Sequence, residues 1–247
     1  MEQNRQIFQT GAPVFTGADV HGAANVRIFL SKVFSYMATA LIISGVMAWW
    51  FGSDLSKLSY LINFETGSHT ILGYVVMFAP LALVFVMGGM VEKMSSTALL
   101  ATFLVFSMIM GISFSYIFLI YPIGSIVNVF FISSAVFGAM AVAGYTTKTD
   151  LTKLGSILFI GLIGIIIASV VNMFMGSSTM DYVISILGVI IFTGLTAYDM
   201  QRLKRMGETA AIGTETTNKM VLMGALSLYL DFINLFLMLL RLFGRRD

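Results

Sequence analysis

The chain has 247 residues, of which 58% are hydrophobic and 11% are charged, and its formal net charge is only +2. Its mean hydropathy is +0.93. A soluble domain carries about 25% charged residues, so this composition excludes an ordinary water-soluble fold and indicates an all-α membrane protein. The low net charge argues against nucleic-acid binding, and the absence of cysteine excludes disulfides and cysteine-ligated metals.

Residues 1–25 are polar and lack the apolar core of a signal peptide. We expect a mobile N-terminal tail there and a single transmembrane domain over residues 26–247. Apolar runs follow one another along that domain, each close to the roughly 20 residues that a spanning helix needs. The seven predicted spans cover residues 26–51, 71–91, 94–120, 126–147, 154–180, 182–198 and 220–240.

The last run combines a bilayer-compatible composition with a polar stripe. Asp231 is the only charged residue between positions 220 and 240, and a carboxylate at that depth costs about 2.5–3.5 kcal/mol on insertion scales. Ser227, Asp231 and Asn234 are spaced i, i+4 and i+7, so a helix places them on one face. The stripe therefore predicts a helix whose polar face points into the bundle.

Lysine and arginine gather in alternate connections between the predicted spans. The N-terminal segment and the connections near Lys93, Lys148 and Arg202 are basic, whereas the intervening connections hold only Lys57. The positive-inside rule then predicts a cytoplasmic N-terminus. Seven crossings would place the final arginines outside, against that rule, and a re-entrant last segment is the alternative. The length of the last run favours seven crossings.

Two carboxylates lie within or directly against the apolar runs, Asp199 at the end of the sixth and Asp231 in the seventh. One hypothesis is a coupled pair that shares a proton and titrates as one unit, since two close acids cannot both ionise cheaply. The alternative is that a nearby lysine or arginine neutralises each separately. Thr196 shares the broad face of Asp199. No nucleophile or metal-ligand cluster accompanies the acids, so we do not expect an enzyme or a cofactor.

Three segments resemble the Bax inhibitor-1 family: ALSLYLDFINLFLMLLRLFG, TGLTAYDMQRL and VRIFLSKVFSYMATAL. The resemblance implies seven helices with the last surrounded by the other six. It also implies a pH-sensitive calcium leak controlled by paired aspartates, which correspond to Asp199 and Asp231. Some bacterial members carry an arginine at the end of the second helix that approaches this pair. The matching position here reads Glu92-Lys93, and Lys93 either reaches inward or snorkels to head groups.

We therefore expect a pH-sensitive calcium-leak channel of a bacterial inner membrane, with Asp199 and Asp231 as the gate. Ser227, Asn234, Thr196, Glu92 and Lys93 are the predicted supporting contacts. The expected partners are the lipid bilayer and calcium as the transported ion, without nucleic acid. The alternative, since the bacterial branch includes such a modulator, is a non-conducting regulatory protein that acts on a membrane-bound protease.

Overall fold

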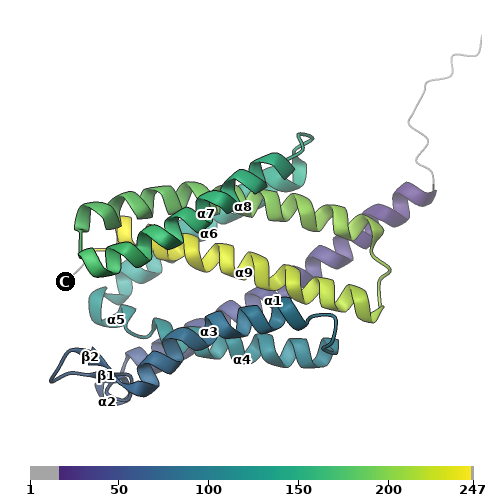
Figure 1. Ribbon diagram of the computed structural model, residues 1–247. Coiled ribbons are helices and arrows are strands. Elements are labelled where there is room, and N and C mark those ends of the chain that lie inside the picture. The colour runs from purple at the N-terminus through teal and green to yellow at the C-terminus, as the bar shows by residue number, and fades with distance from the viewer. Residues whose placement is uncertain (1–16, 246–247) are drawn as a thin grey trace, which may run out of the picture.

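The computed structural model describes residues 17–245, with side chains from residue 22 onward, as a bundle of long helices (Figure 1). The helices are α1 (Gly17–Gly52), α2 (Leu55–Leu58), α3 (Ile71–Met90), α4 (Ser96–Phe114), α5 (Ile117–Ile120), α6 (Ile123–Thr146), α7 (Thr152–Met175), α8 (Ser178–Thr209) and α9 (Glu215–Phe243). Two short antiparallel strands, β1 (Ile62–Asn63) and β2 (Ser68–His69), join α2 to α3. Hydroxyl side chains cap the N-termini of α3, α4, α8 and α9 by accepting backbone N–H groups.

The first helix begins earlier than the sequence analysis expects. Residues 1–16 of the predicted tail lie outside the described residues, but residues 17–25 of it belong to α1. The reason is tertiary contact with the far end of α8. Asn25 donates its side-chain amide to the carbonyl of Ala210 over 3.5 Å, and Val26 is buried where a Cβ on Gly207 would meet it.

The sixth spanning helix is also longer than predicted. α7 stops at Met175, where Gly176 takes a left-handed φ of 62° that glycine adopts without steric cost. α8 then runs through the basic stretch expected as a loop and ends at Thr209. Leu203 is fully buried against the last helix, so this stretch gains enough apolar contact to remain helical.

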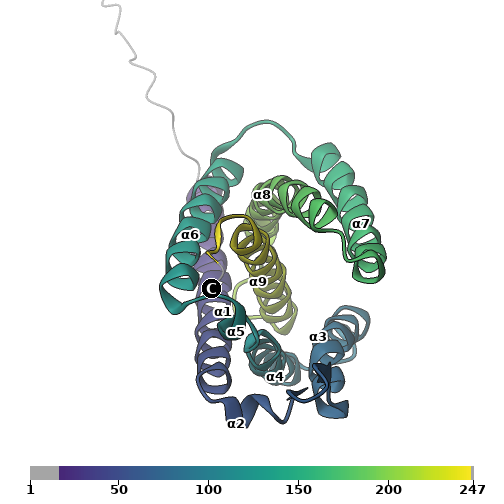
Figure 2. The same ribbon diagram turned by 90° about the vertical axis from the view of Figure 1, so that its left-hand side faces the viewer.

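Seven helical segments of the described chain are long and apolar enough to cross a membrane. Viewed along the bundle, the other six enclose α9 (Figure 2). α9 packs directly against α1, α4, α6 and α8, while α3 packs on α4 and α7 packs on α8. The predicted fold, seven helices with the last at the centre, is thereby confirmed.

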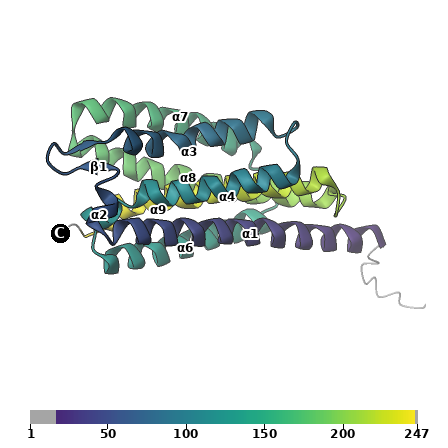
Figure 3. The same cartoon turned by 90° about the horizontal axis from the view of Figure 1, so that it is seen from below.

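The basic connections between helices gather at one end of the bundle, although Lys57, Arg241 and Arg245 lie towards the other end. The start of α1 and the connections at 91–95, 147–151 and 210–214 lie at one end, and the described C-terminal end lies at the other (Figures 1 and 3). Lys93, Lys148 and Lys153 belong to the first end. α9 is one unbroken helix, which favours a seventh crossing over a re-entrant segment. The cytoplasmic orientation of the N-terminus stays a prediction.

A buried hydrogen-bond network between three helices positions α9. The Ser44 hydroxyl of α1 lies 2.7 Å from the Ser107 carbonyl oxygen of α4, to which it donates, and 2.7 Å from the Tyr229 hydroxyl of α9. Phe103 and Phe106 meet the Tyr229 ring edge-on. Hydroxyl groups of this kind hold membrane helices together because no water competes for them. This network joins α1, α4 and α9 at one level of the bundle.

Candidate functional site

Asp199 and Asp231 lie on neighbouring antiparallel helices, α8 and α9 (Figure 1). Each is only 6% exposed. At 1.5 Å per residue, Asp199 lies ~15 Å along α8 from its Thr209 end. Asp231 lies ~24 Å along α9 from its Glu215 end on the same measure. Asp231 is therefore the deeper of the two acids when both are approached from the connection between α8 and α9.

A hydroxyl and a guanidinium hold Asp199. Ser227 of α9 donates a hydrogen bond to Asp199 Oδ2. Arg202 Nη2 lies 3.2 Å from Asp199 Oδ1 and also donates to Ser227 Oγ over 3.2 Å. We call Asp199, Arg202, Ser227 and Asp231 the α8–α9 polar cluster. Its hydrogen bonds join α8 to α9, so a change in the protonation of the cluster would alter the contact between these two helices.

Asp231 occupies the inner edge of this cluster. Its carboxyl interacts electrostatically with Asp199 and Arg202 and lies within hydrogen-bonding reach of the Asp199 carboxyl. A hydrogen bond between two carboxyl groups requires a proton on one of them. With both ionised, Asp231 Oδ2 is buried and has no hydrogen-bond partner among the described residues. A buried, unpartnered carboxylate oxygen is costly, and a proton or a cation bound to Asp231 would lower that cost.

Arg202 is the residue that the sequence analysis missed. The basic composition around Arg202 predicts a connection, but α8 continues through it and places Arg202 one turn after Asp199. The i, i+3 spacing of an acid and an arginine is a recognisable helix-pair signal. The ion pair between Arg202 and Asp199 fits the hypothesis that a basic residue neutralises each acid. The interaction between Asp199 and Asp231 fits the hypothesis of a coupled pair.

Two other predicted contacts are tied to their own helices. The Thr196 hydroxyl donates to the carbonyl of Phe192 over 2.8 Å. The Asn234 amide likewise donates to the carbonyl of Leu230 over 2.8 Å. Such bonds from a side chain to the preceding turn satisfy the polar group locally. Neither residue makes a hydrogen bond to an acid of the cluster among the described contacts.

Glu92 and Lys93 lie at the exposed turn between α3 and α4. The carbonyl oxygen of Glu92 accepts from Lys219 Nζ over 3.2 Å. Within the described part of the chain, Lys93 forms no ion pair with Asp199 or Asp231. The basic partner of the acids is therefore supplied by α8 itself rather than by the end of α3.

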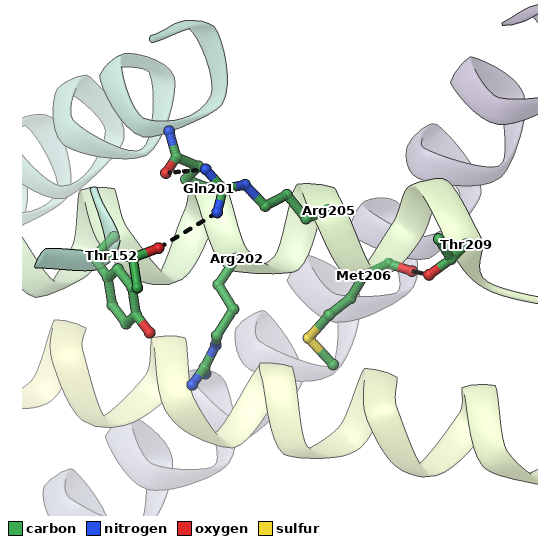
Figure 4. A pocket seen from close by; sticks show the side chains of 7 residues that line it. Thr152, Gln201, Arg202, Arg205, Met206 and Thr209 are labelled. Atoms are coloured by element: carbon green, nitrogen blue, oxygen red, sulfur yellow. Dashed lines mark hydrogen bonds between the residues drawn. The ribbon is translucent and has the colours of Figure 1, made fainter. Parts of the chain in front are cut away.

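A pocket of about 260 Å³ adjoins the cluster at the charged end of the bundle (Figure 4). Seven residues line it: Thr152, Tyr198, Gln201, Arg202, Arg205, Met206 and Thr209. The Arg202 side chain is 44% exposed, whereas that of Asp199 is 9% exposed. Arg202 thus lies between the open pocket and the buried acids.

The cluster offers oxygen donors suited to a hard cation. The two carboxylates are ligands of the type that calcium prefers, and the Ser227 hydroxyl, which donates to Asp199, adds a third oxygen. The described residues contain no group of three or more histidine, cysteine, aspartate or glutamate side chains arranged to hold a metal. A cation here would retain water or take further oxygens, as a transported ion does when it must also leave.

A family model described as "Inhibitor of apoptosis-promoting Bax1" matches residues 26–247. The chain is 47% identical to an uncharacterized protein of Borreliella burgdorferi, over 88% of this chain and 92% of the relative. It is 40% identical to the inner membrane protein YbhL of Escherichia coli K12, over 92% and 95%. It is 37% identical to an uncharacterized membrane protein of Streptococcus pyogenes, over 95% and 98%. The matches cover nearly all of the bundle.

Proposed function

Because the chain belongs to the Bax inhibitor-1 family, we propose that this multi-pass membrane protein is a pH-sensitive calcium leak gated at the α8–α9 polar cluster. The observation that carries the proposal is the Asp231 carboxylate, buried near Asp199 with one oxygen unpartnered among the described residues. Such a group needs a proton or a cation, and calcium and hydrogen ions would compete for it.

The proposed gate has two states that differ in one proton. With a proton shared between Asp199 and Asp231, a hydrogen bond joins α8 to α9 beside the existing bond from Ser227. Without it, the two carboxylates repel each other in a site of low dielectric constant. The contact between α8 and α9 is then the bistable element that a switch requires. Arg202 partly offsets the repulsion and faces the open pocket.

We further propose that the protein resides in a bacterial inner membrane with the basic end of the bundle in the cytoplasm. The name of the Escherichia coli relative, an inner membrane protein, supports the location, and the positive-inside rule supports the orientation. A fluorescent or enzymatic reporter fused after Asp247 tests the orientation. Cytoplasmic labelling of that fusion would contradict it.

Calcium flux into liposomes that contain only the purified protein tests the leak. We expect wild-type flux to change with pH. Asp199→Asn or Asp231→Asn should abolish the shared transition, and the double substitution should add little to either. Glu208→Gln is the matched control, because it removes an exposed carboxylate from α8 outside the cluster.

Strictly additive shifts of the pH midpoint would show that the two acids act independently, which ends the proposal of a shared gate. A folded wild-type protein that passes no calcium at any pH would end the proposal of a leak. That second result would favour the other hypothesis, a non-conducting regulator of a membrane-bound protease.

A further inference from the structure

The pocket between α8 and the start of α7 is rich in hydrogen-bond donors. Two guanidinium groups, from Arg202 and Arg205, line it together with the hydroxyl groups of Thr152, Tyr198 and Thr209. The Thr152 hydroxyl already donates to Asp150 and the Thr209 hydroxyl to the carbonyl of Met206, so Tyr198 supplies the hydroxyl donor of the pocket. The two arginines lie about one helical turn apart on the same face of α8. Their guanidinium groups point apart, that of Arg205 towards Gln201 and Thr152 and that of Arg202 towards α9 (Figure 4). Guanidinium groups are donors that bind phosphate oxygens.

Each arginine of this pocket pairs with one acid. Arg202 Nη2 lies 3.2 Å from the buried Asp199. Arg205 Nη2 lies 2.9 Å from Asp150 and 3.1 Å from Gln201 Oε1, and its Nη1 donates to Thr152 Oγ1 over 3.4 Å, so Nε is its remaining donor. The described contacts of Arg202 with acceptors use Nη2 alone, which leaves its Nη1 and Nε groups for another acceptor. The Arg202 guanidinium also lies 5.9 Å from the centre of the Tyr198 ring, which orients it.

The surroundings of the pocket match the two parts of a phospholipid. On one side, α7 leaves the pocket with a strongly exposed apolar surface that includes Leu154, Ile157 and Ile160, which are 42%, 65% and 70% exposed. Lys148, in the connection before α7, and Lys153, in the first turn of α7, are exposed at the same end of the bundle. Basic pockets at the ends of spanning helices recognise anionic head groups.

We propose that this pocket binds the phosphate head group of an anionic phospholipid, whose acyl chains lie along the exposed face of α7. The site shares Arg202 with the α8–α9 polar cluster but takes the exposed side of that residue, whereas the proposed calcium path uses the buried acids. The polar donors select the charge of the head group, and the apolar face of α7 selects a lipid over free phosphate.

Lipid retention on the purified, full-length protein tests the site. The protein is equilibrated with an equimolar mixture of phosphatidylglycerol and phosphatidylcholine, and the retained lipids are counted by native mass spectrometry. We expect wild type to enrich phosphatidylglycerol, and Arg205→Gln to lower the enrichment about fivefold, the effect of one interfacial arginine. Arg27→Gln is the control, because it removes an exposed arginine of α1 at the same end and outside the pocket.

A second variant keeps the charge and fills the space. Thr209→Trp should also lower the enrichment, and it decides the matter if Arg205→Gln does not fold by circular dichroism. Equal enrichment in wild type and both pocket variants would overturn the proposal, as would an equal loss in Arg27→Gln and Arg205→Gln. Displacement of phosphatidylglycerol by excess inorganic phosphate would show a site for free phosphate and would also overturn it.

Discussion

Arg202→Gln should destabilise the bundle by removing the cation that compensates a buried acid. At 3.2 Å the attraction between Arg202 and Asp199 is ~5 kcal/mol at an effective dielectric constant of 20 and ~1 kcal/mol in bulk water. The Arg202 side chain is 44% exposed, so solvent screens the pair and the lower part of this range applies. Ser227 still donates to Asp199 in the variant. We expect a loss of about 2 kcal/mol, which is far below the cost of breaking a fully buried pair.

Thermal unfolding of the purified protein in detergent measures this loss. A loss of about 2 kcal/mol corresponds to a fall in Tm of about 4–8 °C for a chain of this size. Asp199→Asn combined with Arg202→Gln should recover most of the Tm, because a neutral amide needs no counter-charge. Arg27→Gln, an exposed arginine elsewhere, should leave the Tm unchanged. If Arg202→Gln unfolds at the wild-type temperature, or the double variant is no more stable than the single, the ion pair does not stabilise the bundle.

Two further predictions concern packing and the loop before α7. Gly144→Ala should lower the Tm because its Cβ would lie 2.1 Å from the carbonyl oxygen of Ala197. Gly138→Ala on the same helix is the control and should leave the Tm unchanged, because its Cβ would meet nothing within 4 Å. Equal effects of the two substitutions on the Tm would refute a close approach of α6 to α8. Hydrogen bonds from Thr152, followed by a hydrogen bond from Arg205, lower the pKa of Asp150 from 3.8 to about 2. Its stabilising effect is therefore present above about pH 4 and lost as the pH falls towards 2. The Tm of Asp150→Asn should therefore depend less on pH over that interval, and an unchanged acid dependence would contradict this.

The spans were predictable because each one is an apolar run long enough for the bilayer, and composition alone carries that signal. Their ends were not, because tertiary contacts decide them. Residues 17–25 carry no apolar periodicity, yet they continue α1 where Asn25 and Val26 meet the end of α8. The basic stretch after Asp199 has a loop-like composition, yet buried Leu203 keeps it helical.

The candidate site followed from sequence only in part. Two acids in apolar surroundings are conspicuous, and Ser227 was identifiable by its spacing from Asp231. The role of Arg202 depended on the helix continuing past Asp199, so a wrong boundary concealed a correct chemical partner. Asn234 lies on the predicted face, but its amide is satisfied by the backbone of its own helix, which spacing cannot reveal.

The central place of α9 has a consequence for biosynthesis. The ribosome makes α9 after the six helices that enclose it, and at roughly 5–20 residues per second its 29 residues take about 1.5–6 s to emerge. During that interval the earlier helices already lie in the bilayer, and Ser44 lacks the Tyr229 hydroxyl that it contacts in the finished bundle. A chain that stops before Glu215 therefore lacks the helix against which α1, α4, α6 and α8 pack, and its outer helices have no centre on which to assemble.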